Sequence, residues 1–101
     1  MFAFITNVRA KPGKRDELIA LTETMQQATA TEAGVPVYVF HAAEDDPDEL
    51  WFYDLYVSEE AYNAHCATPE FQNMIANIAA VGEIKVMHKL LPYGQVKSAG
   101  L

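Results

Sequence analysis

The sequence predicts a single α+β domain, in which a four-stranded antiparallel sheet carries its helices on one face. Four stretches are rich in β-branched and aromatic residues, and the stretches between them repeat apolar residues every three or four positions. Their order, strand, helix, strand, strand, helix, strand, is that of the ferredoxin-like βαββαβ plan. The 101 residues suffice for one domain, which we place at 1–101, with a core at 2–92 and a loose C-terminal tail at 93–101.

The first strand and the first helix follow from a change of period. Residues 2–9 are β-prone and end at the turn sequence Lys11-Pro12-Gly13. Residues 14–32 are predicted to form an amphipathic helix of about five turns. Gly34 stands where a helix commonly ends in a left-handed residue. The apolar stripe of this helix consists of Leu18, Leu21, Met25 and Ala28.

The two middle strands flank an acidic stretch. Residues 35–43 are apolar and β-prone, and Pro36 indicates that this strand begins at a sheet edge. Residues 44–49 carry five acidic side chains around Pro47 and are predicted to form a solvated turn. Residues 50–57 have the strongest strand pattern in the chain.

The second helical region is divided in two, and the last strand follows it. Ser58 is a suitable cap for a short helix that runs to about Ala67. Thr68-Pro69-Glu70 restarts the helix with a cap, a proline at the first helical position and an early acid, and Gly82 ends it. Residues 83–91 are predicted to form the final strand.

Composition and charge exclude several classes of function. The chain has 14 acidic and 7 basic side chains, a formal net charge of −7, which disfavours nucleic acid and anionic membranes as partners. Its single cysteine, Cys66, excludes an internal disulfide. No apolar stretch is long enough to span a membrane. The first cation follows the N-terminal apolar run, the reverse of a secretory signal, so we expect a cytoplasmic protein.

The predicted sheet is apolar on both faces. Along residues 50–56, alternation points Leu50, Phe52, Asp54 and Tyr56 one way and Trp51, Tyr53 and Leu55 the other. Helices on one side cover only one of these faces. An exposed face with Trp51, Tyr53 and Leu55 exceeds the apolar patch that monomers usually tolerate. We therefore expect a homodimer through this face.

Four polar residues interrupt the apolar pattern and are candidates for catalysis. Asp54 and Tyr56 share a face of the strongest strand, Asn7 interrupts the first strand, and His65 lies on the short helix. If the helices cover the face that bears Asp54, these side chains converge in one cavity. An amide, a phenol, a carboxylate and an imidazole within an apolar wall suit the binding and deprotonation of a planar phenol or quinol.

Structural roles for the same residues remain open. Asp54 is also suited to pairing with Arg9 or Lys85 across the sheet. His65 is also explained as a cap before Thr68 or as a core histidine, and Asn7 as a partner of backbone groups. His41, His65 and His88 lack metal-ligand spacing, so no metal is expected. Cys66 and His65 diverge on a helix, which disfavours a nucleophilic pair.

A series of short motifs resembles one known family. The motifs are Lys11-Pro12-Gly13-Lys14, Glu32-Ala33-Gly34, Tyr38, His41, Asp46-Pro47, Phe52-Tyr53-Asp54-Leu55-Tyr56 and Ala61-x-x-x-His65 with Thr68-Pro69-Glu70-Phe71-Gln72. In this order, over about residues 2–92, they closely resemble the antibiotic biosynthesis monooxygenase domain. The resemblance implies a dimeric α+β barrel of two facing sheets. Its members include cofactor-independent quinol and anthrone-type monooxygenases, haem-degrading enzymes and an isomerase of a phosphorylated signalling molecule.

The resemblance also assigns roles by position. His65 matches the family histidine, Asp54 stands where the family usually has Glu, and Asn7 lies near a position where several members use Asn. Tyr56 replaces the Trp of some monooxygenase and haem-degrading members and is similar to the isomerase relative. The common Glu-Pro-Gly is Glu32-Ala33-Gly34 here.

We therefore expect a cofactor-independent monooxygenase that oxidises a small aromatic or quinol-like substrate, with O₂ as co-substrate and no metal. His65, paired with Asp54, is expected to remove a phenolic proton, while Asn7 and Tyr56 bind the substrate oxygens. The alternatives are an isomerase of a small phosphorylated molecule, a non-catalytic dimeric binding or stress-response protein and, less favoured, haem degradation. The residues expected to contact the substrate are Ile5, Tyr38, Phe52 and Phe71.

Overall fold

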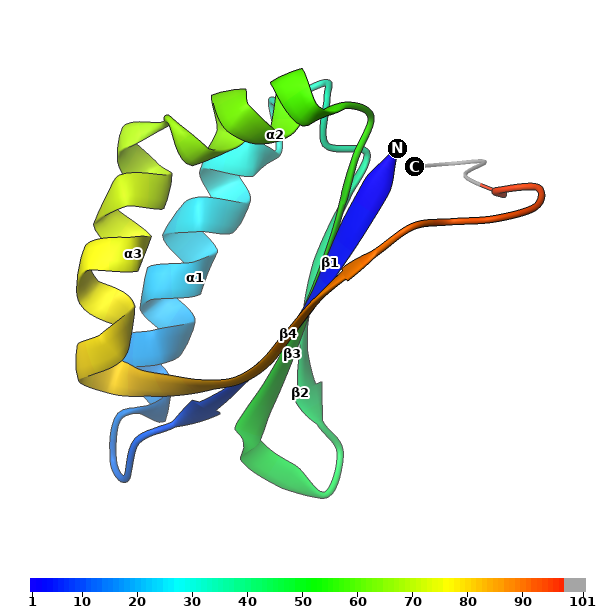
Figure 1. Cartoon of the computed structure of the whole chain (residues 1–101). Coiled ribbons are helices and arrows are strands. Elements are labelled where there is room, and N and C mark those ends of the chain that lie inside the picture. Colours follow the sequence, from blue (N-terminus) through cyan, green and yellow to red (C-terminus); the bar gives the residue numbers. More distant parts are fainter. Residues whose placement is uncertain (98–101) are drawn as a thin grey trace.

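The computed structural model describes residues 1–97 and has the predicted α+β architecture. Four antiparallel strands form one sheet in the order β2-β3-β1-β4, the ferredoxin-like arrangement. All helices lie on one face of this sheet (Figure 1). The elements are β1 (Phe2–Ala10), α1 (Arg15–Thr29), β2 (Val37–Ala43), β3 (Asp46–Tyr56), α2 (Glu59–Cys66), α3 (Pro69–Val81) and β4 (Gly82–Leu90).

Side-chain caps begin the two shorter helices as the sequence predicts. The Ser58 hydroxyl accepts a hydrogen bond from the Ala61 amide at the start of α2. The Thr68 hydroxyl likewise accepts from the Phe71 amide, and Pro69 occupies the first position of α3. None of the helices in residues 1–97 has the length and hydropathy needed to cross a bilayer.

The acidic stretch was wrongly predicted to be a turn throughout. Only residues 44 and 45 form a turn, and β3 already begins at Asp46. Arg9 donates hydrogen bonds to the carboxylates of Asp46 and Glu49 at 2.8 and 2.9 Å, which offsets their repulsion within the strand. The ladder register shifts between Ala42 and Ala43, next to this segment, where an irregular ladder tolerates Pro47.

Gly34 has a packing role and not the predicted left-handed conformation. The glycines with positive φ in the described chain are Gly13 and Gly94. A Cβ on Gly34 would lie 2.5 Å from the Cβ of Ala61. The loop that follows α1 therefore packs directly against α2, which brings two segments that are distant in sequence together.

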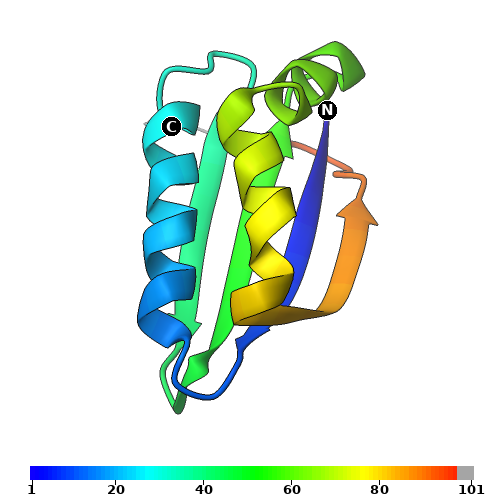
Figure 2. The ribbon, with the colours of Figure 1, turned by 90° about the vertical axis from the view of Figure 1, so that its left-hand side faces the viewer.

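The helices leave one strand of the sheet uncovered. Helices α1 and α3 lie side by side over the sheet, whereas β4 extends beyond α3 (Figure 2). The main core lies between these helices and β1 and β3, around Val8, Leu18 and Leu50. A second cluster around Phe2, Val35 and Tyr56 lies near α2. Residues 91–97 are exposed and form no helix or strand, while the rest of the predicted tail, 98–101, lies outside the described residues.

Candidate functional site

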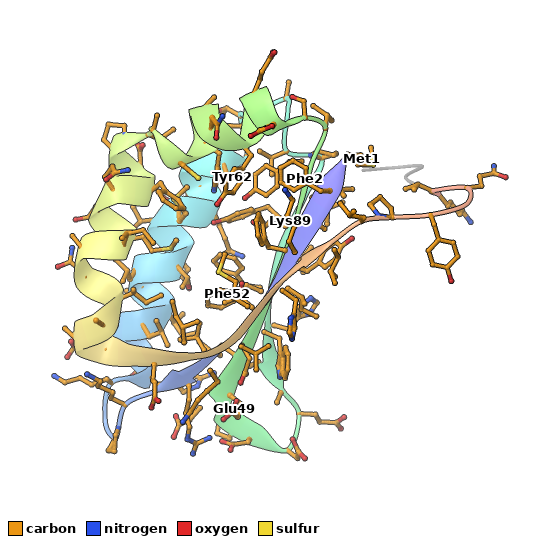
Figure 3. The ribbon with its side chains drawn as sticks, in the orientation of Figure 1. Met1, Phe2, Glu49, Phe52, Tyr62 and Lys89 are labelled. Atoms are coloured by element: carbon orange, nitrogen blue, oxygen red, sulfur yellow. The ribbon has the colours of Figure 1, made fainter. Side chains whose placement is uncertain are left out.

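A cavity of about 100 Å³ lies between the sheet and helices α2 and α3. Its wall is mostly aromatic and aliphatic, with Asp54, Tyr56 and His65 among its polar members. Tyr62 of α2 and Phe52 of β3 point into the layer between helices and sheet (Figure 3). Three lining side chains, Ile75, Ile84 and Met87, are about half exposed, at 50, 47 and 54 %. The cavity therefore opens between α3 and the uncovered β4.

The structure brings three of the four predicted catalytic residues to this cavity. Asp54, Tyr56 and His65 line it, as do three of the predicted substrate contacts, Tyr38, Phe52 and Phe71. The strand register accounts for this, because Phe4 of β1 and Tyr38 of β2 both pair with Asp54 on β3. Side chains directly opposite on paired strands share a face.

Asn7 and Ile5 do not belong to the cavity, and their predicted convergence with the other residues is wrong. Both alternate with Phe4 and Thr6, which line the cavity, so they lie on the opposite face of β1. The Asn7 amide donates hydrogen bonds to the Glu49 carboxylate at 2.8 Å and to the Leu50 carbonyl at 3.0 Å. Glu49 lies toward the β2–β3 hairpin in Figure 3. Asn7 thus has the structural role that the sequence left open.

Asp54 pairs with Tyr56 and not with a cation. The Tyr56 hydroxyl donates a short hydrogen bond to Oδ2 of Asp54. Arg9 instead binds Asp46 and Glu49, and Lys85 pairs with Glu83 at 3.3 Å. Burial raises the pKa of Asp54, and the hydrogen bond from Tyr56 opposes this shift. Burial and the adjacent carboxylate both raise the pKa of Tyr56, so its hydroxyl remains protonated.

The raised pKa of Asp54 predicts a pH-dependent effect on stability. At a pH below 3.8, the ordinary pKa of Asp, most of the carboxyl is protonated in both folded and unfolded chains, and its burial has no ionic cost. As the pH rises through the higher folded pKa, the folded chain must bury a charge and loses stability. Asp54→Asn is therefore expected to raise the free energy of unfolding by on the order of 1 kcal/mol at pH 8 and to change it little at pH 3.5.

Urea denaturation of both proteins across this pH range, at one protein concentration, measures the difference. Glu44→Gln, which changes an exposed carboxylate, is the control and should show no such pH dependence. Equal effects of Asp54→Asn on the free energy of unfolding at pH 3.5 and pH 8 would show that folding does not raise the pKa of Asp54.

His65 is almost fully buried beside the cavity, at 1 % exposed, as is Tyr56. The rings of Tyr38, Tyr56 and Phe71 surround its imidazole, with centroids 5.4 to 5.5 Å away. Its Nδ1 lies 3.1 Å from Oε1 of Glu32. The partner of His65 is thus Glu32, and the predicted pairing with Asp54 is wrong. The backbone carbonyl of His65 accepts a hydrogen bond from the Thr68 hydroxyl, which joins α2 to α3.

Glu32 is a site residue that sequence reasoning did not identify. The sequence marks Glu32-Ala33-Gly34 only as a turn, and Glu32 is 33 positions from His65. No periodic pattern connects a loop carboxylate with a helical histidine at that separation. The sequence feature that relates to this contact is Gly34, because its lack of a side chain lets the loop that carries Glu32 approach Ala61 on α2.

The thiol of Cys66 and the hydroxyl of Tyr62, which lie near the cavity, are not activated as nucleophiles. Burial raises the pKa of the Cys66 thiol, the opposite of the shift found in nucleophilic cysteines. Burial likewise raises the pKa of Tyr62 to about 12. Within residues 1–97, no group of three or more His, Cys, Asp or Glu side chains is placed to hold a metal ion. The chemistry of the cavity therefore centres on His65, Asp54 and Tyr56.

Comparison with protein families identifies the chain. The family model described as antibiotic biosynthesis monooxygenase matches residues 1–77, which include Glu32, Asp54, Tyr56 and His65. The chain belongs to the antibiotic biosynthesis monooxygenase family. This confirms the resemblance seen in the sequence. At the level of this family, the match supports a monooxygenase.

Solved structures share the fold of this family member over nearly its whole length. A Chloroflexus aurantiacus protein, provisionally named an antibiotic biosynthesis monooxygenase, is 27 % identical, with a TM-score of 0.80 over 97 % of this chain and 98 % of its own. Rv0793 from Mycobacterium tuberculosis is 24 % identical, with a TM-score of 0.84 over 95 % of this chain and 98 % of its own. The second likeness shows the fold alone.

A curated relative extends beyond the matched region. The Synechocystis protein sll1783, itself uncharacterized, is 29 % identical over an alignment of 84 residues that covers 79 % of this chain and 57 % of the relative. The chain thus spans little more than half the length of that relative.

Proposed function

We propose that this member of the antibiotic biosynthesis monooxygenase family oxidises a quinol or related polyphenol with O₂, and that the substrate supplies all the electrons. The observation that carries the proposal is the placement of the buried His65 beside the Asp54–Tyr56 pair in an aromatic cavity. A proton acceptor and a hydroxyl-binding carboxylate within an apolar wall match the two ends of a quinol ring.

Each polar group has a distinct task in this proposal. His65 takes the proton of one phenolic hydroxyl, which makes the ring electron-rich. The Oδ1 atom of Asp54 has no donor among residues 1–97, since Tyr56 bonds to Oδ2, and it accepts the second hydroxyl of the substrate. Tyr56 holds the Asp54 carboxylate in place.

The reaction balances without an external reductant. The deprotonated quinol donates electrons to O₂, one oxygen atom forms a bond to a ring carbon, and the other leaves as water. For 1,4-dihydroxynaphthalene the products are 2-hydroxy-1,4-naphthoquinone and water. The substrate loses four electrons in all, which reduce both oxygen atoms of O₂.

The size and charge of the cavity favour this substrate class over the alternatives. Ligand pockets for drug-sized molecules are about 300–1,000 Å³, so a cavity of about 100 Å³ supports a ligand with one ring enclosed and the rest projecting through the mouth. Haem is too large for such a space. The described lining includes no Lys or Arg, so nothing in it favours a phosphorylated substrate for an isomerase.

Oxygen uptake with 1,4-dihydroxynaphthalene tests the proposal. We expect protein-dependent O₂ consumption above the rate of autoxidation, and one labelled oxygen atom per product molecule from ¹⁸O₂. Turnover that persists under strict anaerobiosis would overturn the proposal in favour of an isomerase. Stabilisation by the quinol without any turnover would overturn it in favour of a binding protein.

We also propose that the second face of the sheet forms a homodimer interface. On this face Trp51 and Val39 are 38 and 39 % exposed, and Tyr53 pairs with Val39 two positions along β3 from Trp51. Leu55, which was predicted to be part of the patch, is only 5 % exposed and adds little accessible area. A second copy of the same face is the self-complementary occupant of a two-fold interface. Its formation would remove the exposed Trp51 and Val39 from water.

Trp51→Glu is expected to convert the dimer into a monomer, because it places a charge on the apolar face that the two copies would share. Light scattering at micromolar concentration should give twice the 11.2 kDa chain mass for the unaltered protein and a single chain mass for the variant. Ala20→Glu, on the exposed side of α1, is the matched control and should remain a dimer. A single-chain mass for the unaltered protein would contradict the proposal.

A further inference from the structure

We propose that Glu32 is a positioning residue, which holds the His65 ring in the tautomer that carries its proton on Nδ1 and leaves Nε2 as the acceptor in the cavity. The inference rests on the proposed function, in which His65 removes the substrate proton. It adds a residue to the site and specifies which ring nitrogen reacts.

The contact between the two side chains is close and sheltered. Nδ1 of His65 lies 3.1 and 3.3 Å from the two carboxylate oxygens of Glu32. The side chains of His65 and Glu32 are 2 and 22 % exposed, so water competes weakly for this hydrogen bond. An ionised carboxylate only accepts hydrogen bonds, so the proton in this contact belongs to Nδ1.

The other ring nitrogen is not fully enclosed by the described part of the chain. Nε2 has no hydrogen-bond partner among residues 1–97, whereas Nδ1 has Glu32. Every fully buried side-chain nitrogen or oxygen of that part of the chain has a partner. Nε2 therefore reaches accessible space, and the accessible space beside His65 is the cavity.

The surroundings hold the ring in this orientation. Tyr38 from β2, Tyr56 from β3 and Phe71 from α3 flank the imidazole. The close packing of Gly34 against Ala61 joins the loop of Glu32 to the helix of His65. The other titratable groups nearby are Asp54 from β3 and Tyr62 and Cys66 from α2, and none of them lies within hydrogen-bonding distance of the ring.

The chemical consequence is a defined route for one proton. The substrate O–H bond breaks, its electron pair stays on the phenolate oxygen, and the proton forms an N–H bond at Nε2. The Nδ1 proton stays in place, and the Glu32 carboxylate lies beside the imidazolium that results. A ring with its proton on Nε2 has no lone pair at that position and accepts nothing from the substrate.

The tautomer is directly measurable in the resting protein. ¹⁵N chemical shifts of histidine-labelled protein, with His65 assigned by its loss in His65→Asn, distinguish a proton on Nδ1 from one on Nε2. We expect the neutral ring of the unaltered protein to carry its proton on Nδ1. Glu32→Ala should shift the population toward Nε2–H, as in free imidazole. Glu32→Gln keeps an acceptor oxygen and should retain more of the Nδ1–H form, and the control Glu44→Gln should match the unaltered protein.

An Nε2–H ring in the unaltered protein, or an unchanged tautomer in Glu32→Ala, would overturn the inference. Oxygen uptake with 1,4-dihydroxynaphthalene should fall about 10–100-fold in Glu32→Ala and less in Glu32→Gln. An absence of O₂ uptake in the unaltered protein would instead overturn the proposed function. The ¹⁵N chemical shifts are measured without substrate, so they determine the tautomer of His65 whether or not the protein consumes O₂.

Discussion

His65→Asn is expected to lower the turnover of 1,4-dihydroxynaphthalene by a factor of about 10²–10⁴, since it removes the group that accepts the substrate proton. Asparagine is chosen because its amide is able to donate to the Glu32 carboxylate in the place of Nδ1, which preserves that contact in the buried site. Asparagine has no basic nitrogen, so the structure is kept while the chemistry is lost. Initial rates of O₂ uptake, corrected for autoxidation, give the ratio.

The other histidines provide the matched control. His41, on the edge strand β2, is exposed and does not line the cavity, so His41→Asn should retain the unaltered rate. Circular dichroism of both variants checks that the fold is intact. A rate within a few-fold of the unaltered protein for His65→Asn would remove this residue from the mechanism.

Gly34→Ala is expected to lower the free energy of unfolding by about 1–3 kcal/mol, the usual cost of overpacking. Its new methyl group would lie 2.5 Å from Cβ of Ala61, a distance at which the loop or α2 must move. The companion change Ala61→Gly removes that methyl, at a helix-propensity cost of about 1 kcal/mol. The double variant should therefore be more stable than the sum of the single effects predicts, by about 1 kcal/mol or more.

Chemical denaturation of the four proteins completes this double-mutant cycle. Gly13→Ala supplies the control, because Gly13 has a φ of 73° with no atom within 4 Å of its Cβ position. It should cost stability through backbone strain, with no coupling to Ala61→Gly. If the effects of Gly34→Ala and Ala61→Gly on the free energy of unfolding add within about 0.5 kcal/mol, the two positions are not coupled, and the close approach of Gly34 to Ala61 does not limit the size of the side chain.

Alternation along the strongest strand predicted the part of the cavity wall that β3 contributes. The period of two placed Phe52, Asp54 and Tyr56 on one face of β3, and the structure agrees. By the same period, Asn7 lies on the face of β1 that points away from the cavity lined by Phe4. The sequence does not tell which face of β1 adjoins which face of β3, because that depends on the register in which Phe4 pairs with Asp54.

Contacts between segments that are distant in the sequence could not be predicted. The acidic residues at the start of β3 read as a turn because their partner, Arg9, lies on another strand. On α1, the buried stripe includes Thr22 and Thr29, whose hydroxyls donate to the carbonyls of Ile19 and Met25. Those local bonds make threonine acceptable in a core position, which a hydrophobicity pattern does not register.

The gap between α3 and β4 has a kinetic consequence. Ile75, Ile84 and Met87 form an entrance that is open in the resting protein, so no lid has to move before a ligand enters. Association should then be governed by diffusion and by the fit of an apolar molecule, and product release should not wait for a conformational step. The chemical steps at His65 would limit the rate. Turnover should accordingly be slower in D₂O, where the substrate hydroxyls carry deuterium, and be insensitive to solvent viscosity.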